Sequence, residues 1–454
     1  MTQLHRILDA RPIGTLAAYE RAGGGRALEA ARTSEPGGLV EVVTAAGLRG
    51  RGGAGFPTGR KWATVVDEAD GTPVTVVVNA AEGEPGTLKD RTLLRRNPYQ
   101  VLEGALIAAQ VVGSDRVVVG MKRSAGAERS RVDAAIDELA EAGWTKGISV
   151  ECVARSDRYL VGEETALLEV IDGRPPFPRV APPYRDGVDD AHRITLVNNV
   201  ETLANVPSIV RDGPEAFRAL GTSESPGTIV CTVSGCTPRA GVGEFELGTP
   251  LIEVLEELGD VSRDGVVAVL SGTANPLLTA DALDAPLSWE GLAAAGGGLG
   301  SAGFIVIDES ADIVAVAHGV SHFLSVESCG QCTPCKQDGL AITGLLDRVR
   351  SSAPDPEDGG VALSTLSARV TDGARCFLAQ QHQNVVQSVL AHFPGALAAH
   401  VDGRADAAER FPIVPLDDIV DGQAVLALDE LDLAPDWGDG TTTSPSDRID
   451  VRAR

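Results

Sequence analysis

The sequence is poor in aromatic residues and in positive charge. Aromatic side chains make up 4% of its 454 residues, whereas glycine occurs 52 times and proline 26 times. The 43% of hydrophobic residues exclude wholesale disorder, and the core must rest on Val, Leu, Ile and Ala. The 39 Lys and Arg residues stand against 64 Asp and Glu residues, a formal net charge of −25. Such an acidic surface repels phosphate backbones, so nucleic-acid binding is not expected as the main role.

Long hydrophobic runs and a disulfide-rich cysteine pattern are missing too. No run reaches the roughly 20 apolar residues that a membrane helix needs, and residues 1–20 lack the basic start and apolar run of a signal peptide. Seven cysteines are an odd number and a low density for a disulfide scaffold. We therefore expect a cytoplasmic protein without direct membrane insertion.

Strand and helix patterns divide the chain into regions. Residues 1–48 have helical spacing, and strand-like runs at Val74–Val78 and Arg116–Val119 alternate with helical stretches at 101–112 and 134–142. This alternation predicts an α/β domain with a largely parallel sheet over residues 1–225.

Three further regions follow. Short strands around one helix at Leu251–Leu258 predict a small β-grasp-like domain over residues 226–310. Helical periodicity predicts a helical domain over residues 311–400. Residues 401–454 form an acidic tail ending in Gly438–Ser444, which we expect to be mobile.

Four cysteines have the spacing of an iron–sulfur site. Cys329, Cys332 and Cys335 are each separated by two residues, and Cys376 follows far downstream. Three closely spaced thiolates can wrap one face of a [4Fe–4S] cluster, and a distant fourth closes the site. Structural zinc more often uses two separated Cys-x2-Cys pairs, and unrelated buried thiols rarely produce this spacing. The pattern therefore favours a [4Fe–4S] cluster over these two alternatives.

A glycine-rich loop at Gly50–Gly59 is a candidate phosphate site. Gly50–Gly55 matches G-x-G-x-x-G by letters, but a predicted helix precedes it where the dinucleotide fingerprint requires a strand. Glycine N–H groups can nevertheless approach an anion closely. The neighbouring positive charges are Arg49, Arg51, Arg60 and Lys61. The alternative is an ordinary mobile loop.

Three polar motifs are expected at the ends of strands or the starts of helices. They are Asn79–Pro85 with Glu82 and Glu84, Tyr159–Thr165 with Gly162, Glu163 and Glu164, and Asn198–Thr202. Ligands of α/β proteins bind at the carboxyl ends of parallel strands. These amides and carboxylates can therefore orient a flavin, a carboxamide or a ribose. Solvated turns and helix caps are the alternatives.

Six motifs in one order resemble a known family. They are Gly47–Trp62, Asn79–Arg91, Tyr159–Gly173, Asn198–Pro207, Ser234–Leu251 and Glu327–Cys335. The chain resembles the NADH-binding FMN/[4Fe–4S] flavoprotein subunit of respiratory complex I and the diaphorase subunits of NAD-linked hydrogenases and formate dehydrogenases. The resemblance implies a Rossmann-like FMN-binding α/β domain, a β-grasp domain of the soluble-ligand-binding type and a C-terminal helical bundle that carries the cluster.

The resemblance also implies an activity and its site. The enzyme would take hydride from NADH onto FMN and pass single electrons through the [4Fe–4S] cluster. The partner would be a thioredoxin-like [2Fe–2S] or ferredoxin-like protein, and any contact with a membrane would be peripheral, through partner subunits. The implied FMN contacts are Gly50, Arg51, Gly52, Gly53, Gly55, Gly59, Lys61, Asn79, Tyr159, Gly162, Glu163, Asn198, Asn199 and Thr202. Nicotinamide would stack near Phe56, with Glu82, Glu84 and Glu164 as the catalytic carboxylates.

Some positions depart from the family pattern. Ala81 stands where the family usually has Asp, Thr64 where an aromatic residue lines the NADH pocket, and Ala181 where a Lys reaches the adenine side. These changes leave an alternative open, a flavin/iron–sulfur electron relay linked to ferredoxin that has lost efficient NADH binding.

Overall fold

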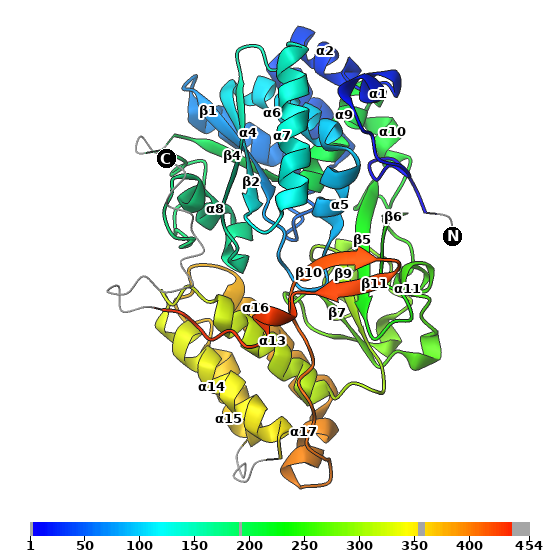
Figure 1. Cartoon of the computed structure of the whole chain (residues 1–454), viewed down its shortest axis with the longest axis vertical. Helices are drawn as coiled ribbons and strands as arrows, with labels where there is room; N and C mark the ends of the chain where they lie inside the picture. Colours follow the sequence, from blue (N-terminus) through cyan, green and yellow to red (C-terminus); the bar gives the residue numbers. More distant parts are fainter. Residues whose placement is uncertain (1–2, 190–192, 353–358, 438–454) are drawn as a thin grey trace.

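A computed structural model describes residues 3–189, 193–352 and 359–437 (Figure 1). An α/β layer occupies the upper part of Figure 1, a second sheet lies below it on one side, and a group of helices forms the lower end. Among the described helices, none combines the length and hydrophobicity that crossing a membrane requires.

A four-stranded parallel sheet lies at the centre of the α/β unit. Its strands are β1 (Val74–Ala80), β2 (Ser114–Lys122), β3 (Ser149–Ser156) and β4 (Thr195–Asn199), in the order β3-β2-β1-β4. All neighbouring pairs are parallel. Val76, Val77 and Val78 are fully buried, as expected for a strand that is covered on both faces. The predicted parallel α/β architecture is confirmed.

Helices surround this sheet. They are α1 (Leu16–Arg21), α2 (Arg26–Thr33), α3 (Pro36–Ala46), α4 (Thr58–Ala69), α5 (Lys89–Arg96), α6 (Pro98–Val112), α7 (Gly126–Glu141), the 3-10 turn η1 (Tyr159–Gly162), α8 (Glu164–Ile171), α9 (Val200–Asp212) and α10 (Pro214–Arg218). Helix α6 is buried almost all round, and a Cβ at Gly104 would lie 2.0 Å from the carbonyl oxygen of Leu203. Glycine at that position therefore lets α6 and α9 pack closely.

The second unit is built on a mixed five-stranded sheet. It contains β5 (Thr228–Gly235), β6 (Gly241–Glu246), β7 (Ala268–Ser271), β8 (Leu278–Thr279) and β9 (Gly303–Ile307), in the order β6-β5-β9-β7-β8. Only the pair β5–β9 is parallel among these described strands. Its helical segments are α11 (Leu251–Gly259), η2 (Arg263–Gly265), η3 (Ala280–Ala282) and α12 (Trp289–Ala294).

The lower unit is helical. It contains α13 (Ile313–Glu327), α14 (Thr333–Arg350), α15 (Gly359–Arg369), α16 (Leu378–His392) and α17 (Pro394–Val401). Helix α13 is buried along nearly its whole length because α14 and α16 both pack against it. Among the described residues from 311 to 401, the regular elements are helices.

Residues 402–437, which we name the C-terminal strap, run back along the rest of the molecule. The strap contains the antiparallel hairpin β10 (Leu416–Val420) and β11 (Gln423–Leu426), followed by η4 (Leu428–Glu430). Figure 1 shows the hairpin beside α5 and the second sheet, and the end of the strap along the helical unit.

The strap contacts all three units. The Leu416 carbonyl accepts a hydrogen bond of 3.0 Å from Arg91 of α5, and Leu431 O lies 3.1 Å from His322 Nε2 of α13. The Gly422 carbonyl accepts a bond of 2.7 Å from the backbone N–H of residue 240 in the second unit. This part of the acidic tail is thus held against the rest of the molecule, because its backbone is bonded and Ile413 is buried. Gly438–Ser444 lie outside the described residues.

Candidate functional site: a cysteine pocket and a polar sheet edge

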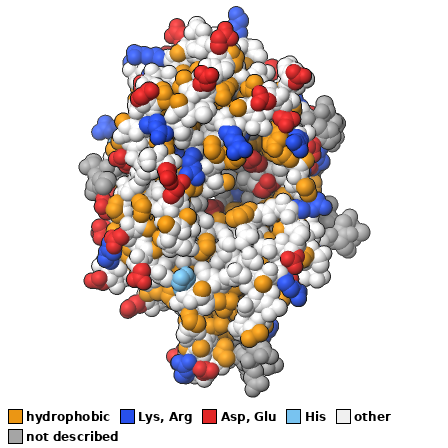
Figure 2. Space-filling view, turned by 180° about the vertical axis from the view of Figure 1, so that it is seen from behind, with side chains coloured by type: hydrophobic (Ala, Val, Ile, Leu, Met, Phe, Trp, Pro, Cys, Tyr) orange, Lys and Arg blue, Asp and Glu red, His pale blue; other side chains and the backbone are white. Residues whose placement is uncertain are grey.

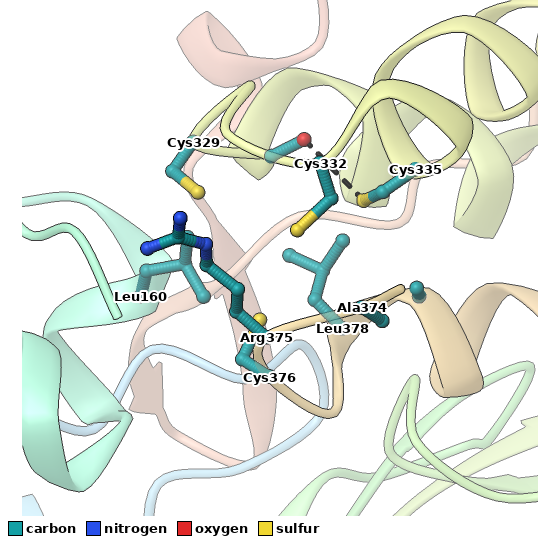
Figure 3. Close-up of a pocket in the computed structure, with 10 residues that line it drawn as sticks. Leu160, Cys329, Cys332, Cys335, Ala374, Arg375, Cys376 and Leu378 are labelled. Carbon is teal, nitrogen blue, oxygen red and sulfur yellow. Dashed lines mark hydrogen bonds between the residues drawn. The ribbon is translucent and has the colours of Figure 1, made fainter. Parts of the chain in front are cut away.

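Four thiols surround one pocket (Figure 3). Cys329 and Cys332 come from the loop before α14, Cys335 comes from the first turn of α14, and Cys376 comes from the segment before α16. The other lining residues are Leu160, Ser328, Ala374, Arg375, Leu378 and Ala379. Within the described ranges, no three His, Cys, Asp or Glu side chains are arranged to hold a single metal ion. Four thiols around one space, three of them from a Cys-x2-Cys-x2-Cys run, fit the ligand set of a [4Fe–4S] cluster.

Burial makes two of these thiols harder to ionise. Burial raises the pKa of Cys376 to about 12 and also raises the pKa of Cys335. Iron supplies the positive charge that stabilises the thiolate forms, so cluster binding is coupled to proton release. Ser328 Oγ lies 3.5 Å from Cys335 Sγ, and Gln331 Nε2 lies 3.4 Å from Cys329 Sγ. These polar groups beside sulfur are of the kind that tunes cluster potentials.

Two distant segments hold the cysteine loop. Gln331 Nε2 donates to the carbonyl of Pro178 at 3.3 Å, which connects the loop to the proline-rich segment 174–187. Trp437, in the strap, donates its indole N–H to the carbonyl of Ser328 at 2.9 Å. Its ring packs on Gly330, where a Cβ would lie 2.4 Å from a ring carbon. Neither contact is indicated by any pattern in the sequence.

The glycine-rich loop is closed at its base. The N–H of Gly50 donates to the carbonyl of Phe56 at 2.8 Å, and Thr58 donates to Leu48 at 2.9 Å. Gly53 and Gly55 have φ angles of +125° and +62°, which L side chains rarely adopt. Among the described residues no side chain caps the N-terminus of α4, which follows the loop. Loop and helix start therefore form a cradle that suits an anion.

The neighbouring positive charges do not all face this cradle. The Arg51 side chain is 1% exposed, with Nη2 3.3 Å from the carbonyl of Pro226, and burial lowers its pKa to about 10. Lys61 forms an ion pair with Glu164 and donates to Val197 O at 3.2 Å. The expected contribution of Arg51 as a phosphate charge is therefore wrong, because its side chain points into the protein.

The three predicted asparagines lie at the carboxyl ends of neighbouring strands β1 and β4. Asn79 Nδ2 donates to the carbonyl of Gly162 at 2.8 Å, and Asn198 Oδ1 accepts from Trp62 Nε1 at 2.8 Å. Asn199 is paired with Asn79 in the parallel register and caps α9. The structure thus brings these predicted residues to one edge of the sheet. Thr202 Oγ1, in the first turn of α9, accepts the N–H of residue 51 at 2.8 Å.

Glu82 and Glu84 are bonded to protein groups through both of their oxygens. Glu82 accepts the backbone N–H groups of Asp90 and Arg91 at 3.0 and 3.1 Å, which caps α5. Burial, with a smaller contribution from the Asp90 charge, raises the pKa of Glu82 to about 7. Glu84 accepts from the N–H of Thr273 at 3.1 Å, and from the hydroxyl of residue 301 at 2.6 Å. Glu84 therefore links the α/β unit to the second sheet.

The motif before α8 combines a helix cap with more exposed groups. Glu163 accepts the N–H groups of Thr165 and Ala166 at 3.1 and 2.8 Å, so it caps the helix. Glu164, next to it, is the partner of Lys61. Tyr159 lies toward the helical unit, where its hydroxyl accepts from Gln381 Nε2 at 2.8 Å.

Sequence reasoning missed a buried ion network beneath this edge. Lys89 Nζ lies 2.8 Å from Asp90 Oδ1 and 2.9 Å from Glu201 Oε2, and it is 3.5 Å from Asn199 Oδ1. Lys89 and Glu201 are both almost completely buried. Both occur within the six motifs, but neither periodicity nor spacing shows that they meet.

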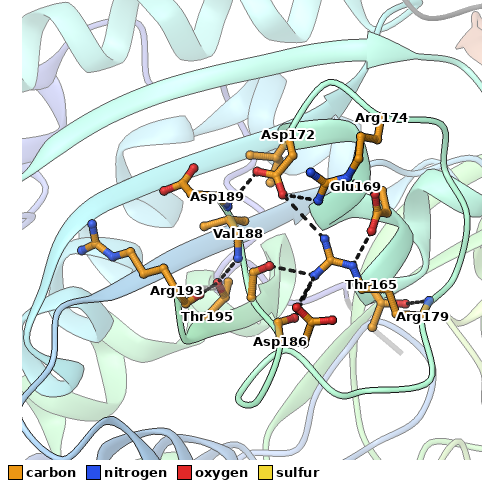
Figure 4. A network of polar contacts seen from close by, with 12 residues as sticks. Thr165, Glu169, Asp172, Arg174, Arg179, Asp186, Val188, Asp189, Arg193 and Thr195 are labelled. Carbon is orange, nitrogen blue, oxygen red and sulfur yellow. Dashed lines mark hydrogen bonds and ion pairs between the residues drawn. The ribbon is translucent and has the colours of Figure 1, made fainter. Parts of the chain in front are cut away.

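A second network fixes the proline-rich segment to α8 (Figure 4). Arg179 donates through Nη1 to the carbonyls of Asp186 and Gly187 at 2.9 and 2.7 Å, and its Nε pairs with Glu169 of α8. Its backbone N–H also donates to Thr165 Oγ1 at 2.8 Å. Arg179 therefore holds the segment that contains Ala181 beside the start of α8. Seen from behind relative to Figure 1, the molecule has a central hollow with charged and apolar side chains around it (Figure 2).

Comparisons with known proteins identify the family. Residues 43–208 match the Nuo51 FMN-binding domain, and residues 315–400 match the NADH-ubiquinone oxidoreductase-F iron-sulfur binding region. The second NADH-quinone oxidoreductase F subunit of Rhizobium meliloti (strain 1021) is 37% identical over 415 residues, which cover 88% of this chain and 98% of that relative. The chain belongs to the family of NADH-quinone oxidoreductase F subunits.

Other relatives agree with this assignment. The NADH-quinone oxidoreductase F subunit of Mycobacterium bovis (strain ATCC BAA-935 / AF2122/97) is 35% identical over 405 residues, covering 86% of this chain and 91% of the relative. A crystal structure of an NAD+-reducing [NiFe]-hydrogenase in the H2-reduced state matches with a TM-score of 0.78 and 32% identity, covering 88% of this chain and 68% of that chain. The predicted cofactors, FMN and a [4Fe–4S] cluster, are confirmed at the level of the family.

Proposed function

We propose that this chain performs the electron input of its family with FMN at the polar sheet edge and the [4Fe–4S] cluster in the cysteine pocket. Electron input from NADH through FMN to an iron–sulfur cluster is the activity that the family assignment supports, and the alternative of a relay without NADH binding is not favoured. FMN supplies the conversion of a hydride into single electrons, and the cluster carries those electrons onward. The observation that carries the assignment is the presence of both family regions in one chain, with four thiols around one pocket in the second.

The residues that we propose to hold FMN differ in the chemical groups that they present to it. The exposed crest of the glycine-rich loop offers backbone N–H groups, which suit the phosphate. Asn79, Asn198 and Asn199 place amides at the carboxyl edge of the sheet, which suits the polar edge of a flavin. For Arg51 we propose a contact through the backbone only, since its side chain is buried elsewhere. The remaining proposed contacts are Lys61, Tyr159, Gly162, Glu163 and Thr202.

The nicotinamide side carries the proposed catalytic carboxylates. Phe56 is 43% exposed and offers an aromatic face for stacking. Of the three carboxylates, Glu164 has the greatest conformational freedom, since its side chain and that of its ion-pair partner Lys61 are both partly exposed. Glu82 and Glu84 act through position, because each already accepts two hydrogen bonds from the protein. NADH binding despite Ala81, Thr64 and Ala181 is part of this proposal.

We assign domain boundaries and partners on the same basis. The proposed domains are 1–225 for FMN and NADH, 226–310 as a β-grasp unit of the soluble-ligand-binding type, 311–400 as the cluster-carrying bundle, and 401–454 as the tail whose residues 402–437 form the strap. Because the relatives are named as subunits, we propose that this chain has partner subunits, with a thioredoxin-like [2Fe–2S] or ferredoxin-like protein as the electron acceptor. We propose a cytoplasmic location, with any membrane contact made through those partners.

An anaerobic titration tests the proposed function. NADH added to the purified holoprotein should bleach the flavin absorbance, with full reduction of FMN and cluster at about 1.5 equivalents because NADH delivers two electrons and these groups accept three. NADPH should be much less effective. A flavin spectrum that ignores NADH and bleaches only with dithionite would contradict the proposal. An identical titration of a Glu164→Gln variant should need more NADH, because a group at the nicotinamide side would be lost.

A further inference from the structure

The second unit reaches the glycine-rich loop through one tryptophan. The ring of Trp289, the first residue of α12, packs against two arginines of the loop region. The guanidinium carbons of Arg49 and Arg51 are 4.3 and 5.1 Å from the ring centroid. A Cβ at Gly55 would lie 2.3 Å from the indole nitrogen. Three residues of the loop region therefore pack against a side chain from another unit.

Polar contacts reinforce this packing. Glu290, the neighbour of Trp289, forms an ion pair with Arg49 and accepts a hydrogen bond from the Ser225 hydroxyl. Arg49 Nε in turn donates to the carbonyl of Gly55 at 2.9 Å. Arg49 is thus fixed to α12 and at the same time fixes the carbonyl of a glycine that has a positive φ angle.

Trp289 contacts the two guanidinium groups through the face of its ring and not through its N–H. Trp289 Nε1 is buried and has no hydrogen-bond partner among the described residues. Replacing the indole by another aromatic ring therefore removes no hydrogen bond, whereas removing the ring removes the surface on which both guanidinium groups stack. Tryptophan gives the strongest such surface and phenylalanine a weaker one.

We propose that Trp289 is a positioning residue that holds the glycine-rich loop in its FMN-retaining form. The five-stranded unit thereby controls the retention of the flavin. This inference rests on the proposed placement of FMN at that loop. It goes beyond that placement because Trp289 belongs to neither of the two segments matched to the family.

Flavin retention in purified holoprotein tests this role. We expect Trp289→Ala to release FMN about tenfold faster than the wild type, measured by the rise in free-flavin fluorescence after dilution. Trp289→Phe should stay within about threefold of the wild type, because the aromatic face is kept. Iron and labile sulfide per chain should be equal in all variants, since the cysteine pocket is not touched.

The controls separate this role from general destabilisation. Trp289→Leu keeps an apolar volume without a ring, so it covers the case in which the Ala variant fails to fold. Asp284→Asn, which removes an exposed ion pair with Arg263 in the same unit, should leave FMN release unchanged.

Two outcomes would overturn the role proposed for Trp289, and a third would contradict the proposed function. A Leu or Ala variant that folds and releases FMN at the wild-type rate would overturn the role of Trp289. Equally fast release of FMN from the Phe and Ala variants would overturn it as well, because the aromatic face would then not be what retains the flavin. A wild type that holds no FMN at all would instead contradict the proposed function.

Discussion

The two loops assigned to cofactors are stabilised in different ways. The glycine-rich loop is closed by its own backbone bonds and packs on a buried arginine and on Trp289. The cysteine loop carries three of the four thiols around one site and is held from outside by Gln331 and Trp437. A loop closed by its own backbone bonds keeps its shape without its ligand, whereas a loop whose thiols are ligands of one cluster depends on that cluster to join them. We therefore expect FMN loss to be mild for the fold and cluster loss to be severe.

Removing a cluster ligand tests this difference most strongly. We expect Cys376→Ser and Cys332→Ser to reduce iron and labile sulfide to a small fraction of the wild-type content and to lower the melting temperature, because the pocket between α14 and α16 would lose its filling. FMN content, measured by fluorescence after denaturation, should be unchanged.

A matched control is Cys231→Ser, which alters a buried thiol away from the pocket. If the ligand variants lose FMN as fully as iron, the two loops are not independently stabilised, and the comparison fails.

Loss of the contacts between the strap and the cysteine loop should have the next largest effect, which is faster release of iron. Trp437→Ala removes the 2.9 Å bond to Ser328 and the stacking of Lys336 Nζ, which lies 4.6 Å from the ring centroid. Together these contacts should slow cluster loss, so we expect release of iron to a chelator to be about tenfold faster in the variant. Absorbance of the iron–chelator complex follows this rate. The rate of iron release from Trp437→Phe should lie between those of the wild type and Trp437→Ala, since Phe keeps the ring but not the N–H.

Release of FMN from the same variants should match the wild type. An unchanged rate of iron release in Trp437→Ala would show that the cysteine loop does not need the strap.

The proline-rich segment contacts the cysteine loop and the start of α8, and a change in it should have a smaller effect. Arg179→Lys keeps the charge but loses the planar fork that binds two carbonyls and Glu169. We expect KM for NADH to rise about threefold to tenfold with kcat nearly unchanged, if the segment positions the substrate and takes no part in the chemistry, as we propose. Steady-state kinetics with an artificial acceptor measures both constants. A fall in kcat at constant KM would place Arg179 in the reaction itself.

The smallest expected effect concerns pH. The pKa of Glu82 is raised from 4.5 to about 7, so between these values the folded state binds more protons than the unfolded state. The contribution of Glu82 to the free energy of unfolding is therefore present below pH 4.5 and is lost as the pH rises through 7. We expect a change on the order of 1 kcal/mol, since the charges of Lys89 and Asp90 act on Glu82 in opposite directions.

Urea unfolding of the wild type and of Glu82→Gln from pH 4.5 to 7.5 measures this effect. The variant should show the shallower dependence on pH. Parallel curves would show that Glu82 does not titrate in this range.

The sequence predicted the local patterns well because those patterns are short-range. The run at Val74–Val78 indicated a doubly buried strand, and the spacing of Cys329, Cys332 and Cys335 indicated a shared site. Contacts between distant segments could not be read in the same way. Positive charge beside a glycine-rich loop suggested an anion contact, but the direction of Arg51 depends on Pro226 and Glu201, which lie far along the chain.

The contacts of the strap with the rest of the molecule could not be predicted from the sequence. Its acidic composition and low periodicity are typical of a mobile tail. Its order comes from scattered contacts with three separate units, such as Arg95 with Asp418 at 2.6 Å and Trp437 with Ser328. No spacing within the strap records these partners, so only the folded chain reveals them.

Low-temperature electron paramagnetic resonance of the anaerobic holoprotein tests the central claim most directly, that electrons from NADH reach the cysteine pocket. The account predicts that NADH produces the signal of a reduced [4Fe–4S] cluster in the wild type, and that Cys376→Ser lacks this signal while its flavin still bleaches. A wild type whose flavin is reduced by NADH without any cluster signal, although dithionite produces one, would contradict the account.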